Sequence, residues 1–250
     1  MDKGYVNLTV DNGIGNIVFF HPASNSMPSG LLKNLSETIE RADSDDRVKV
    51  IVIKSVGRTF CAGASFDELM SLNDFDTAVS FFMGFARVIN TMRKSNKFII
   101  VQVQGKAVGG GVGIIAAADY AMATDLAAVR LSELSIGIGP YVIAPAVKRK
   151  IGLAAFSELS INATAWHTAF WAREKGLFAK VLDSQKDLEE AVSLLSEKLV
   201  GYDTDAMRLL KRELWSDADD WDELLAKNAE ISARLSLGDF TKQVLKKIKK

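Results

Sequence analysis

The chain has 250 residues, with 31 Lys and Arg against 31 Asp and Glu, so its formal net charge is zero. A balanced charge argues against duplex DNA or RNA as the main partner, because neutralising phosphates requires a basic surface. The single cysteine, Cys61, excludes an intramolecular disulfide, and two histidines are too few to complete a Cys/His zinc site. Composition therefore predicts a soluble globular protein of one or two domains with no structural metal site.

Apolar runs along the chain are too short for a membrane span. The longest weakly polar run, residues 107–118, is glycine-rich and falls well below the ~20 apolar residues that a spanning helix needs. The first residues are both acidic and basic and contain no long apolar stretch, so we expect no secretory signal. These features predict a cytoplasmic or organelle-matrix protein with no membrane partner.

Strand and helix patterns alternate in the first half of the chain. Residues 6–10 and 17–20 flank Asp11-Asn12-Gly13, which predicts a hairpin. Ser29 is expected to cap a helix with apolar positions on one face. The β-branched run at residues 50–53 is typical of a strand buried on both faces.

The rest of the chain predicts a second buried strand and then mainly helices. After a helix at residues 76–94 we expect strands at 98–103, 120–123 and 129–131, and helices near 143–150, 153–160, 164–174, 186–200, 203–215 and 220–235. No internal repeat of fixed period is visible. We predict an α/β core at residues 1–200 and a C-terminal helical lobe at residues 201–250.

Two glycine-rich stretches follow the two predicted buried strands. They are FCAGASFDEL at residues 60–69 and QGKAVGGGVG at residues 104–113. Small residues let a ligand approach the backbone, and N–H groups at a helix start carry a partial positive charge. Two such turns at adjacent strand ends can aim two donors at one oxygen, forming an oxyanion hole in which each donor contributes about 3 to 4 kcal/mol. The alternatives are a flexible turn or a packing point; a dinucleotide or phosphate loop is disfavoured because neither loop pattern is present.

Three motifs in order, FCAGASFDEL, GKAVGGGVGIIAAADYAMAT and LSELSIGIGP, resemble the crotonase superfamily, or enoyl-CoA hydratase/isomerase family, over residues 21–181. The resemblance implies an α/β, ClpP-like spiral of ββα units with a C-terminal helical trimerisation region. It also implies an acyl-CoA substrate, no cofactor apart from the CoA of that substrate, and a homotrimer or dimer of trimers.

The resemblance assigns site residues as well. The backbone N–H groups of Ala64 and Gly110 would hold the thioester oxygen. Residues implied to contact CoA or the acyl group are Ala23, Ser24, Ala62, Ser65, Phe66, Gly109, Gly113, Pro140, Tyr141 and Lys242. His21 stands where the family often has Arg, and Ser65 where many relatives have Asp.

Glu133 is the candidate general acid/base. Family hydratases commonly carry two glutamates, and here the first position is Gly113 while Glu133 occupies the second. An apolar wall of Leu131, Leu134 and Ile136 would raise the pKa of the carboxyl toward the range useful for proton transfer. Outside this motif, a glutamate at a strand end would be read as a surface residue.

The sequence leaves several alternative reactions open. A single carboxylate is what 3-enoyl to 2-enoyl-CoA isomerases use, whereas residues 136–145 resemble a bacterial branch of methylglutaconyl-CoA hydratases that tolerates glycine at the first position. This second likeness favours hydration, with a place in leucine degradation, narrowly over isomerisation. The second proton donor would then be water or a side chain such as Glu68, and Gly113→Glu would raise hydratase activity. An acyl-CoA decarboxylase and a weakly catalytic acyl-CoA-binding protein are the other hypotheses.

Overall fold

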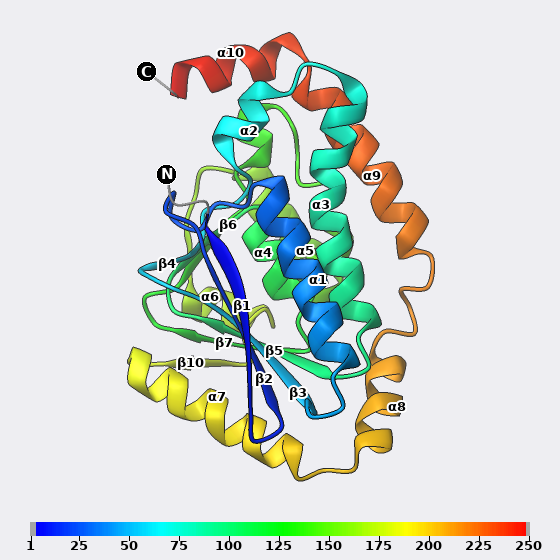
Figure 1. Cartoon of the computed structure of the whole chain (residues 1–250). Coiled ribbons are helices and arrows are strands. Elements are labelled where there is room, and N and C mark those ends of the chain that lie inside the picture. Colours follow the sequence, from blue (N-terminus) through cyan, green and yellow to red (C-terminus); the bar gives the residue numbers. More distant parts are fainter. Residues whose placement is uncertain (1–3, 249–250) are drawn as a thin grey trace.

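Two β-sheets form the centre of the molecule, whose computed structural model describes residues 4–248 (Figure 1). The larger sheet has the order β1-β2-β3-β5-β7-β10 and the smaller has the order β4-β6-β8-β9. The larger sheet contains β1 (Tyr5–Asp11), β2 (Ile14–Phe20), β3 (Val50–Ser55), β5 (Phe98–Val103), β7 (Tyr120–Thr124) and β10 (Lys180–Leu182). The smaller contains β4 (Thr59–Cys61), β6 (Lys106–Val108), β8 (Ala128–Arg130) and β9 (His167–Thr168). This is a mixed α/β architecture, as predicted.

The predicted hairpin opens the larger sheet. Strands β1 and β2 pair antiparallel up to Asp11 opposite Ile14. Asn12 and Gly13 adopt positive φ angles of 47° and 82°, which a two-residue turn between twisted strands requires. The remaining strands of this sheet pair in parallel.

Both faces of the larger sheet are covered, as the β-branched run predicted. On β3, Ile51 and Ile53 enter the main apolar core, whereas Val50 and Val52 enter a second cluster with Leu188 on α7 (Gln185–Val200). Figure 1 shows α7 below the sheet and α1 (Ser29–Ser44) beside α3 (Phe75–Lys94) on the other side. Alternating residues of one strand therefore serve two cores.

Three consecutive segments repeat one path. Each runs through a strand of the larger sheet, then a short strand of the smaller sheet, then a helix. The segments are β3-β4-α2, β5-β6-α4 and β7-β8-η1, with α2 at Phe66–Ser71, α4 at Gly110–Ala116 and the 3₁₀ helix η1 at Glu133–Ile136. Because β4, β6 and β8 are neighbours and parallel, the three strand-to-helix junctions meet at one edge of the smaller sheet.

The C-terminal helices return to the core. They are α8 (Thr204–Leu214), α9 (Trp221–Ser236) and α10 (Asp239–Ile248), and they follow α5 (Ala144–Ile161) and α6 (Ala169–Glu174) in the chain. Trp215, Leu225 and Leu245 belong to the same apolar core as α3. The helical lobe is present, and its division from the core at residue 201 stays a prediction.

Some predicted elements differ from the structure. Ser29 is the first residue of α1 and not its cap, because Pro28 holds that position without a side-chain bond. The segment predicted as a helix at residues 164–174 starts instead with β9, which pairs with β8. The short strands β4, β6 and β10 were not predicted, since runs of three residues carry too little pattern.

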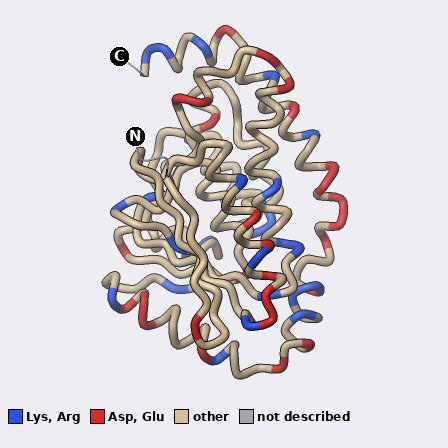
Figure 2. The backbone as a smooth tube through the Cα atoms, in the orientation of Figure 1, with Lys and Arg blue, Asp and Glu red and all other residues tan. Residues whose placement is uncertain are grey.

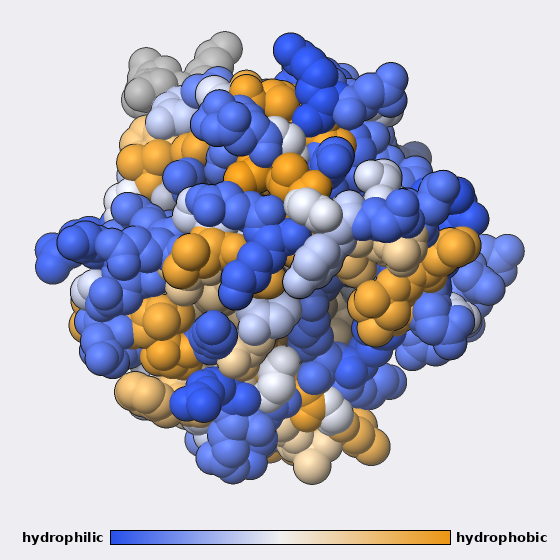
Figure 3. Space-filling model, turned by 90° about the horizontal axis from the view of Figure 1, so that it is seen from below, coloured by the Kyte–Doolittle hydropathy of each residue, from blue (hydrophilic) through white to orange (hydrophobic). Residues whose placement is uncertain are grey.

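Charged residues are mixed over the surface. Figure 2 shows Lys and Arg interspersed with Asp and Glu along most of the backbone, with several lysines on α10. In Figure 3, apolar side chains form separate patches among hydrophilic ones on the face seen from below. Within residues 4–248, no helix is long and apolar enough to cross a membrane, and no group of three or more His, Cys, Asp or Glu is placed to hold a metal ion.

Candidate active site

A cavity of about 400 Å³ opens where β4, β6 and β8 end. Each strand-to-helix junction contributes to its wall: Ala64 from the first, Gly110 from the second and Glu133 from the third. The apolar part of the wall includes Phe82 and Phe85 of α3. The two glycine-rich stretches and the candidate acid/base thus share one cavity.

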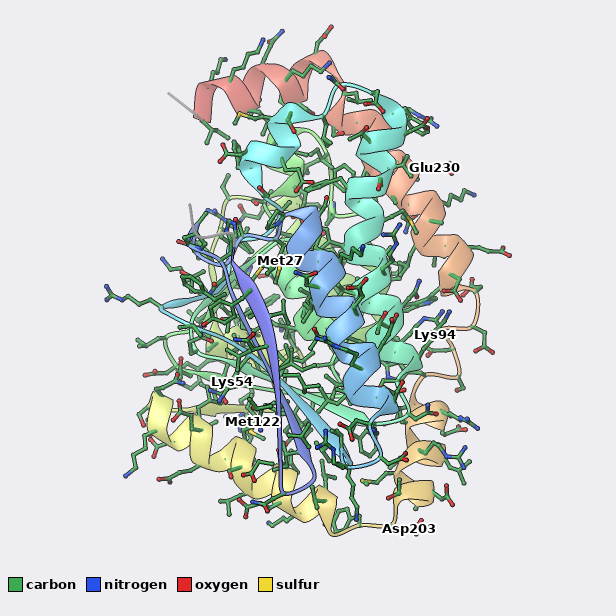
Figure 4. All side chains as sticks on the ribbon, in the orientation of Figure 1. Met27, Lys54, Lys94, Met122, Asp203 and Glu230 are labelled. Carbon is green, nitrogen blue, oxygen red and sulfur yellow. The ribbon has the colours of Figure 1, made fainter. Side chains whose placement is uncertain are left out.

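The first junction is held by Met27, which lies just before α1 (Figure 4). Met27 N–H donates to the Gly63 carbonyl at 2.8 Å, and Ser65 N–H donates to the Met27 carbonyl at 3.2 Å. These two bonds bracket Ala64, and Gly63 turns the chain with a φ of +90°. Within residues 4–248 no acceptor takes the Ala64 N–H, so this donor is free for a ligand.

The second junction turns at Gly109, whose φ is +53°. Gly109 N–H donates to the Arg130 carbonyl at 2.9 Å, and the Gly109 carbonyl accepts from Val112 and Gly113. Gly110 N–H has no acceptor in the described part of the chain. A Cβ on Gly110 would lie 2.0 Å from the Phe85 ring, so only glycine fits this position.

The two junctions lie against each other. Cys61 pairs with Ala107 between β4 and β6, and a Cβ on Gly63 would lie 3.1 Å from the Val108 carbonyl oxygen. Because the free N–H groups of Ala64 and Gly110 both border the cavity, the arrangement can supply two donors to one oxygen.

Glu133 begins the 3₁₀ helix after β8, and its half-buried side chain lies beside Gly109. A Cβ on Gly109 would lie 2.7 Å from Glu133 Oε1, so the glycine makes room for the carboxyl group. Glu133 Oε2 is buried with no hydrogen-bond partner among residues 4–248. Burial raises the pKa of Glu133 to about 7, because the charged form loses hydration. The carboxyl can therefore both accept and return a proton near neutral pH.

The apolar wall predicted around Glu133 is only partly present. Ile136 lines the cavity and Leu131 is fully buried, but Leu134 is 52% exposed. Leu134 follows Glu133 in a 3₁₀ helix, where consecutive side chains point in different directions. Leu134 is therefore not part of the environment that raises the pKa.

Gly113, the position of the first family glutamate, lies behind the cavity wall. It is buried and is not among the cavity-lining residues. A Cβ there would lie 2.4 Å from Ile143 Cγ2, so the Ile143 side chain fills the space that a longer residue would need. Gly113 packs α4 against α5 and does not present a ligand contact.

Glu68, considered as a second proton donor, is used elsewhere. Its Oε2 accepts a 2.7 Å hydrogen bond from the Ser29 N–H at the start of α1, where a carboxylate also complements the helix dipole. Ser65 caps α2 through the Glu68 N–H and likewise does not line the cavity. Among the described residues that line the cavity, Glu133 is the only carboxylic acid.

The other predicted contact residues divide into three groups. Cavity-lining ones are Ala62, Phe66, Gly109, Pro140 and Tyr141. The Ser24 carbonyl accepts a 3.1 Å hydrogen bond from the N–H of the cavity-lining Ala62, so Ser24 and its neighbour Ala23 lie next to the cavity. Lys242 lines a separate hollow between α2 and α10. Lys249 and Lys250 lie outside the described residues.

Cys61 and His167 have structural roles. Cys61 is fully buried, and burial raises the pKa of its thiol to about 12, so it carries no thiolate at neutral pH. The His167 ring packs at a tilt against Trp171, with ring centres 4.3 Å apart, and its Nε2 lies 3.0 Å from Glu158 Oε1. His167 does not line the cavity.

Sequence reasoning missed several polar residues of the cavity. They are Arg130, Ser132, Ser135, Thr164 and Ser232. Arg130 and the two serines flank Glu133 in the chain, so their proximity to the motif was a usable signal. Thr164 and Ser232 come from distant elements, and no local pattern brings them to the site.

The family model described as enoyl-CoA hydratase/isomerase matches residues 9–244. A peroxisomal bifunctional enzyme from Cavia porcellus is 27% identical over 78% of this chain, which spans only 26% of that protein. A trans-2-decenoyl-[acyl-carrier-protein] isomerase from Streptococcus mutans is 24% identical over 98% of this chain and 95% of its own length.

Solved structures show the same architecture. An enoyl-CoA hydratase from Bacillus halodurans superposes with a TM-score of 0.91 at 20% identity, covering 97% of this chain and 99% of the other. That likeness establishes the crotonase fold, and the family match covers nearly the whole sequence. The chain belongs to the enoyl-CoA hydratase/isomerase family.

Proposed function

We propose that this protein is an enoyl-CoA isomerase that moves a double bond between the 3 and 2 positions of an acyl thioester. The observation that carries the proposal is that Glu133, the one carboxylic acid among the described cavity-lining residues, shares the cavity with two free backbone N–H groups. The Streptococcus mutans relative of nearly equal length is named a trans-2-decenoyl-[acyl-carrier-protein] isomerase, which supports isomerisation.

The chemistry follows from the geometry. Ionised Glu133 takes a proton from C2 of the 3-enoyl thioester, and the electrons move onto the thioester oxygen. The N–H groups of Ala64 and Gly110 stabilise that enolate oxygen. Protonated Glu133 then returns the proton to C4, which leaves the 2-enoyl product. One carboxyl group suffices because the proton removed is the proton returned.

Hydration makes a further demand on the site. Water must be held and deprotonated at C3 while C2 receives a proton, which family hydratases achieve with two glutamates. Here Ile143 fills the space beside Gly113, and Glu68 is bonded to Ser29. The absence of a second carboxyl group among the described cavity residues therefore favours isomerisation.

A second candidate is hydration of a methylglutaconyl-CoA-like substrate. The observation in its favour is the group of hydroxyl side chains that line the cavity near Glu133, namely Ser132, Ser135 and Thr164. Hydroxyl groups can hold a water molecule by accepting and donating hydrogen bonds.

A substrate panel tests these alternatives. The purified protein is incubated with 3-hexenoyl-CoA, crotonyl-CoA, 3-methylglutaconyl-CoA and malonyl-CoA, and each product is identified by mass and ultraviolet absorbance. Isomerisation leaves the mass of 3-hexenoyl-CoA unchanged and creates a conjugated thioester. Hydration adds one water, decarboxylation removes CO₂, and a protein that only binds acyl-CoA changes none of them. Rapid hydration without isomerisation would contradict our proposal.

We further propose a homotrimer or a dimer of trimers located in the cytoplasm, and catalysis without a cofactor. The proposed assembly is supported by the resemblance of the C-terminal helices to those of the family. Light scattering of the purified protein measures the assembly directly, and a monomer at micromolar concentration would contradict it.

A further inference from the structure

Arg130 is a cationic side chain of the cavity that lacks an acceptor. It ends β8, three residues before Glu133, and it lines the same cavity. Its Nε is buried with no hydrogen-bond partner, and no carboxylate among residues 4–248 forms an ion pair with its guanidinium. The guanidinium lies 4.4 Å from the centre of the Trp166 ring.

Stacking on Trp166 does not satisfy this group. An aromatic face stabilises the cation from one side, but the five N–H donors of a guanidinium lie in its own plane. Lys106 contacts the same ring at 4.8 Å, and it too forms no ion pair within the described chain. Lys106 lines a different hollow, so Arg130 is the one basic residue among the described residues that line the cavity. A half-buried donor without an acceptor is costly.

We propose that Arg130 binds a carboxylate carried by the acyl chain, so that the preferred substrates are enoyl thioesters with a second, distal carboxyl group. The proposal rests on the proposed function only in taking the cavity as the site of an enoyl thioester. A guanidinium can bind a carboxylate with two parallel hydrogen bonds, and such pairs are strong and geometrically selective.

The position of Arg130 favours the acyl chain over the CoA phosphates as the source of the anion. The Arg130 carbonyl accepts from the N–H of Gly109, the residue directly before Gly110. This bond holds the main chain of Arg130 beside the end of the cavity where the thioester carbon would lie. The CoA phosphates would be separated from that carbon by the whole pantetheine arm. Ser132 and Ser135 also border this region and can complete the solvation of a carboxylate.

Binding of unreactive esters tests the proposal without depending on turnover. Isothermal titration calorimetry compares glutaryl-CoA with valeryl-CoA, which have equal chain length but differ in the distal carboxylate. We expect the wild type to bind glutaryl-CoA at least about tenfold more tightly than valeryl-CoA, because one charge-assisted hydrogen bond contributes about that much to affinity. In Arg130→Leu the ratio should fall to within about twofold of unity, whereas Arg130→Lys should keep part of it. The matched control, Lys106→Leu, removes the other cation on Trp166 and should keep the full ratio.

Turnover separates this proposal from the isomerase assignment. The wild type is compared on 3-hexenedioyl-CoA and 3-hexenoyl-CoA. A glutaryl-CoA preference that depends on Arg130 without turnover of either enoyl ester would support the anion site and contradict the isomerase. Turnover of both esters with equal kcat/KM, and no glutaryl-CoA preference, would overturn the anion site alone.

Two further outcomes would also overturn the role of Arg130. The first is a preference for glutaryl-CoA that persists in Arg130→Leu. The second is a change in the assembly mass of Arg130→Leu, measured by light scattering, because Arg130 would then contact a neighbouring subunit. Circular dichroism and valeryl-CoA binding show whether each variant is folded, and Arg130→Lys supplies the test if the leucine variant is not.

Discussion

At the scale of single residues, Glu133 shows how burial makes a carboxyl group reactive. Its pKa is raised to about 7 by loss of hydration, which a hydrogen bond with its own backbone N–H offsets only in part. A proton acceptor with a pKa near the working pH combines a useful ionised fraction with adequate basicity. The same burial that disfavours the charge therefore prepares the group for proton transfer.

Replacing this carboxyl group should remove catalysis without removing binding. Glu133→Gln keeps the side-chain size but cannot take a proton, so kcat should fall by roughly 10² to 10⁴-fold. In the wild type, kcat/KM should rise with pH up to about 7 and then level off, because the ionised form is the base. The pH profile and acyl-CoA affinity of both proteins are the measurements. Unchanged turnover in the variant would refute the role of Glu133.

The raised pKa of Glu133 also predicts a pH-dependent stability. The folded protein holds this proton up to about pH 7, whereas the carboxyl group of an exposed glutamate has a pKa of 4.5. Stability should therefore be lost as pH rises from about 4.5 through 7, since the unfolded state binds fewer protons in that range. Glu133→Gln should reduce the stability difference between pH 5 and pH 8 by a few kcal/mol. Urea unfolding of both proteins at the two pH values measures this, and equal pH dependence would count against the raised pKa.

The surroundings of Gly113 change the expected effect of a glutamate at this position, which the sequence predicted to raise hydratase activity. Gly113→Glu alone should not create a second catalytic glutamate, because its Cβ would clash with Ile143. Overpacking of this kind costs about 1 to 3 kcal/mol or more, so the melting temperature should fall. Gly113→Glu combined with Ile143→Ala provides space for the new side chain. Hydration of crotonyl-CoA should appear only in the double variant, and Ile143→Ala alone is the control.

At the scale of elements, a buried ion pair connects α8 to the larger sheet. Lys211 Nζ lies 2.9 Å from Asp119 Oδ2 and also donates to the carbonyls of Met92 and Lys97. Asp119 further accepts from Trp215 Nε1 at 2.8 Å. Both charged side chains are at most 5% exposed, so each depends on the other for compensation.

Removing one partner of this pair should be strongly destabilising. Lys211→Met leaves the Asp119 carboxylate buried without its cation, and we expect a loss of about 3 to 5 kcal/mol in unfolding free energy. Arg47→Ala breaks the exposed pair with Asp45 and should leave the unfolding free energy nearly unchanged, because solvent screens exposed ion pairs. Chemical denaturation gives both values. Similar small effects would mean that the buried pair does not hold α8 in place.

The sequence predicted long elements well and short ones poorly. Sequence patterns are clear in β3, β5 and α7, because these elements bury many side chains. The three-residue strands β4 and β6 carry no such pattern, although they place the two N–H donors. Likewise, Glu133 was found through a motif, while Arg130 could be recognised only after the fold placed it in the cavity.

At the scale of the whole molecule, the C-terminal helices complete the site. Ser232 of α9 and Ile248 of α10 line the cavity together with the junctions of the smaller sheet. Figure 1 shows α10 crossing the end of the molecule next to α2. A Cβ on Gly137 would lie 2.6 Å from the Phe240 ring, so α10 also packs against the turn that carries Glu133.

Shortening the chain should therefore impair the site more than the fold. A variant ending at Gly238 lacks α10, including the buried Leu245, but keeps most of the apolar core. We expect a higher KM for acyl-CoA and a lower kcat, with circular dichroism close to that of the full chain. Lys247→Ala changes only an exposed residue of α10 and is the control. Wild-type kinetics in the shortened protein would show that α10 is dispensable for the cavity.

Each of the three successive ββα units contributes a different group to the cavity. In the proposed function, the first two units supply main-chain N–H groups, and the second does so because glycine fits beside Phe85. The third unit supplies the side chain that transfers protons. Under the proposed function, a substitution at the third junction should therefore change the proton transfer while the two main-chain donors stay in place. The two N–H donors would then be the constant part of the site, and the residue at position 133 would be the part that sets the reaction.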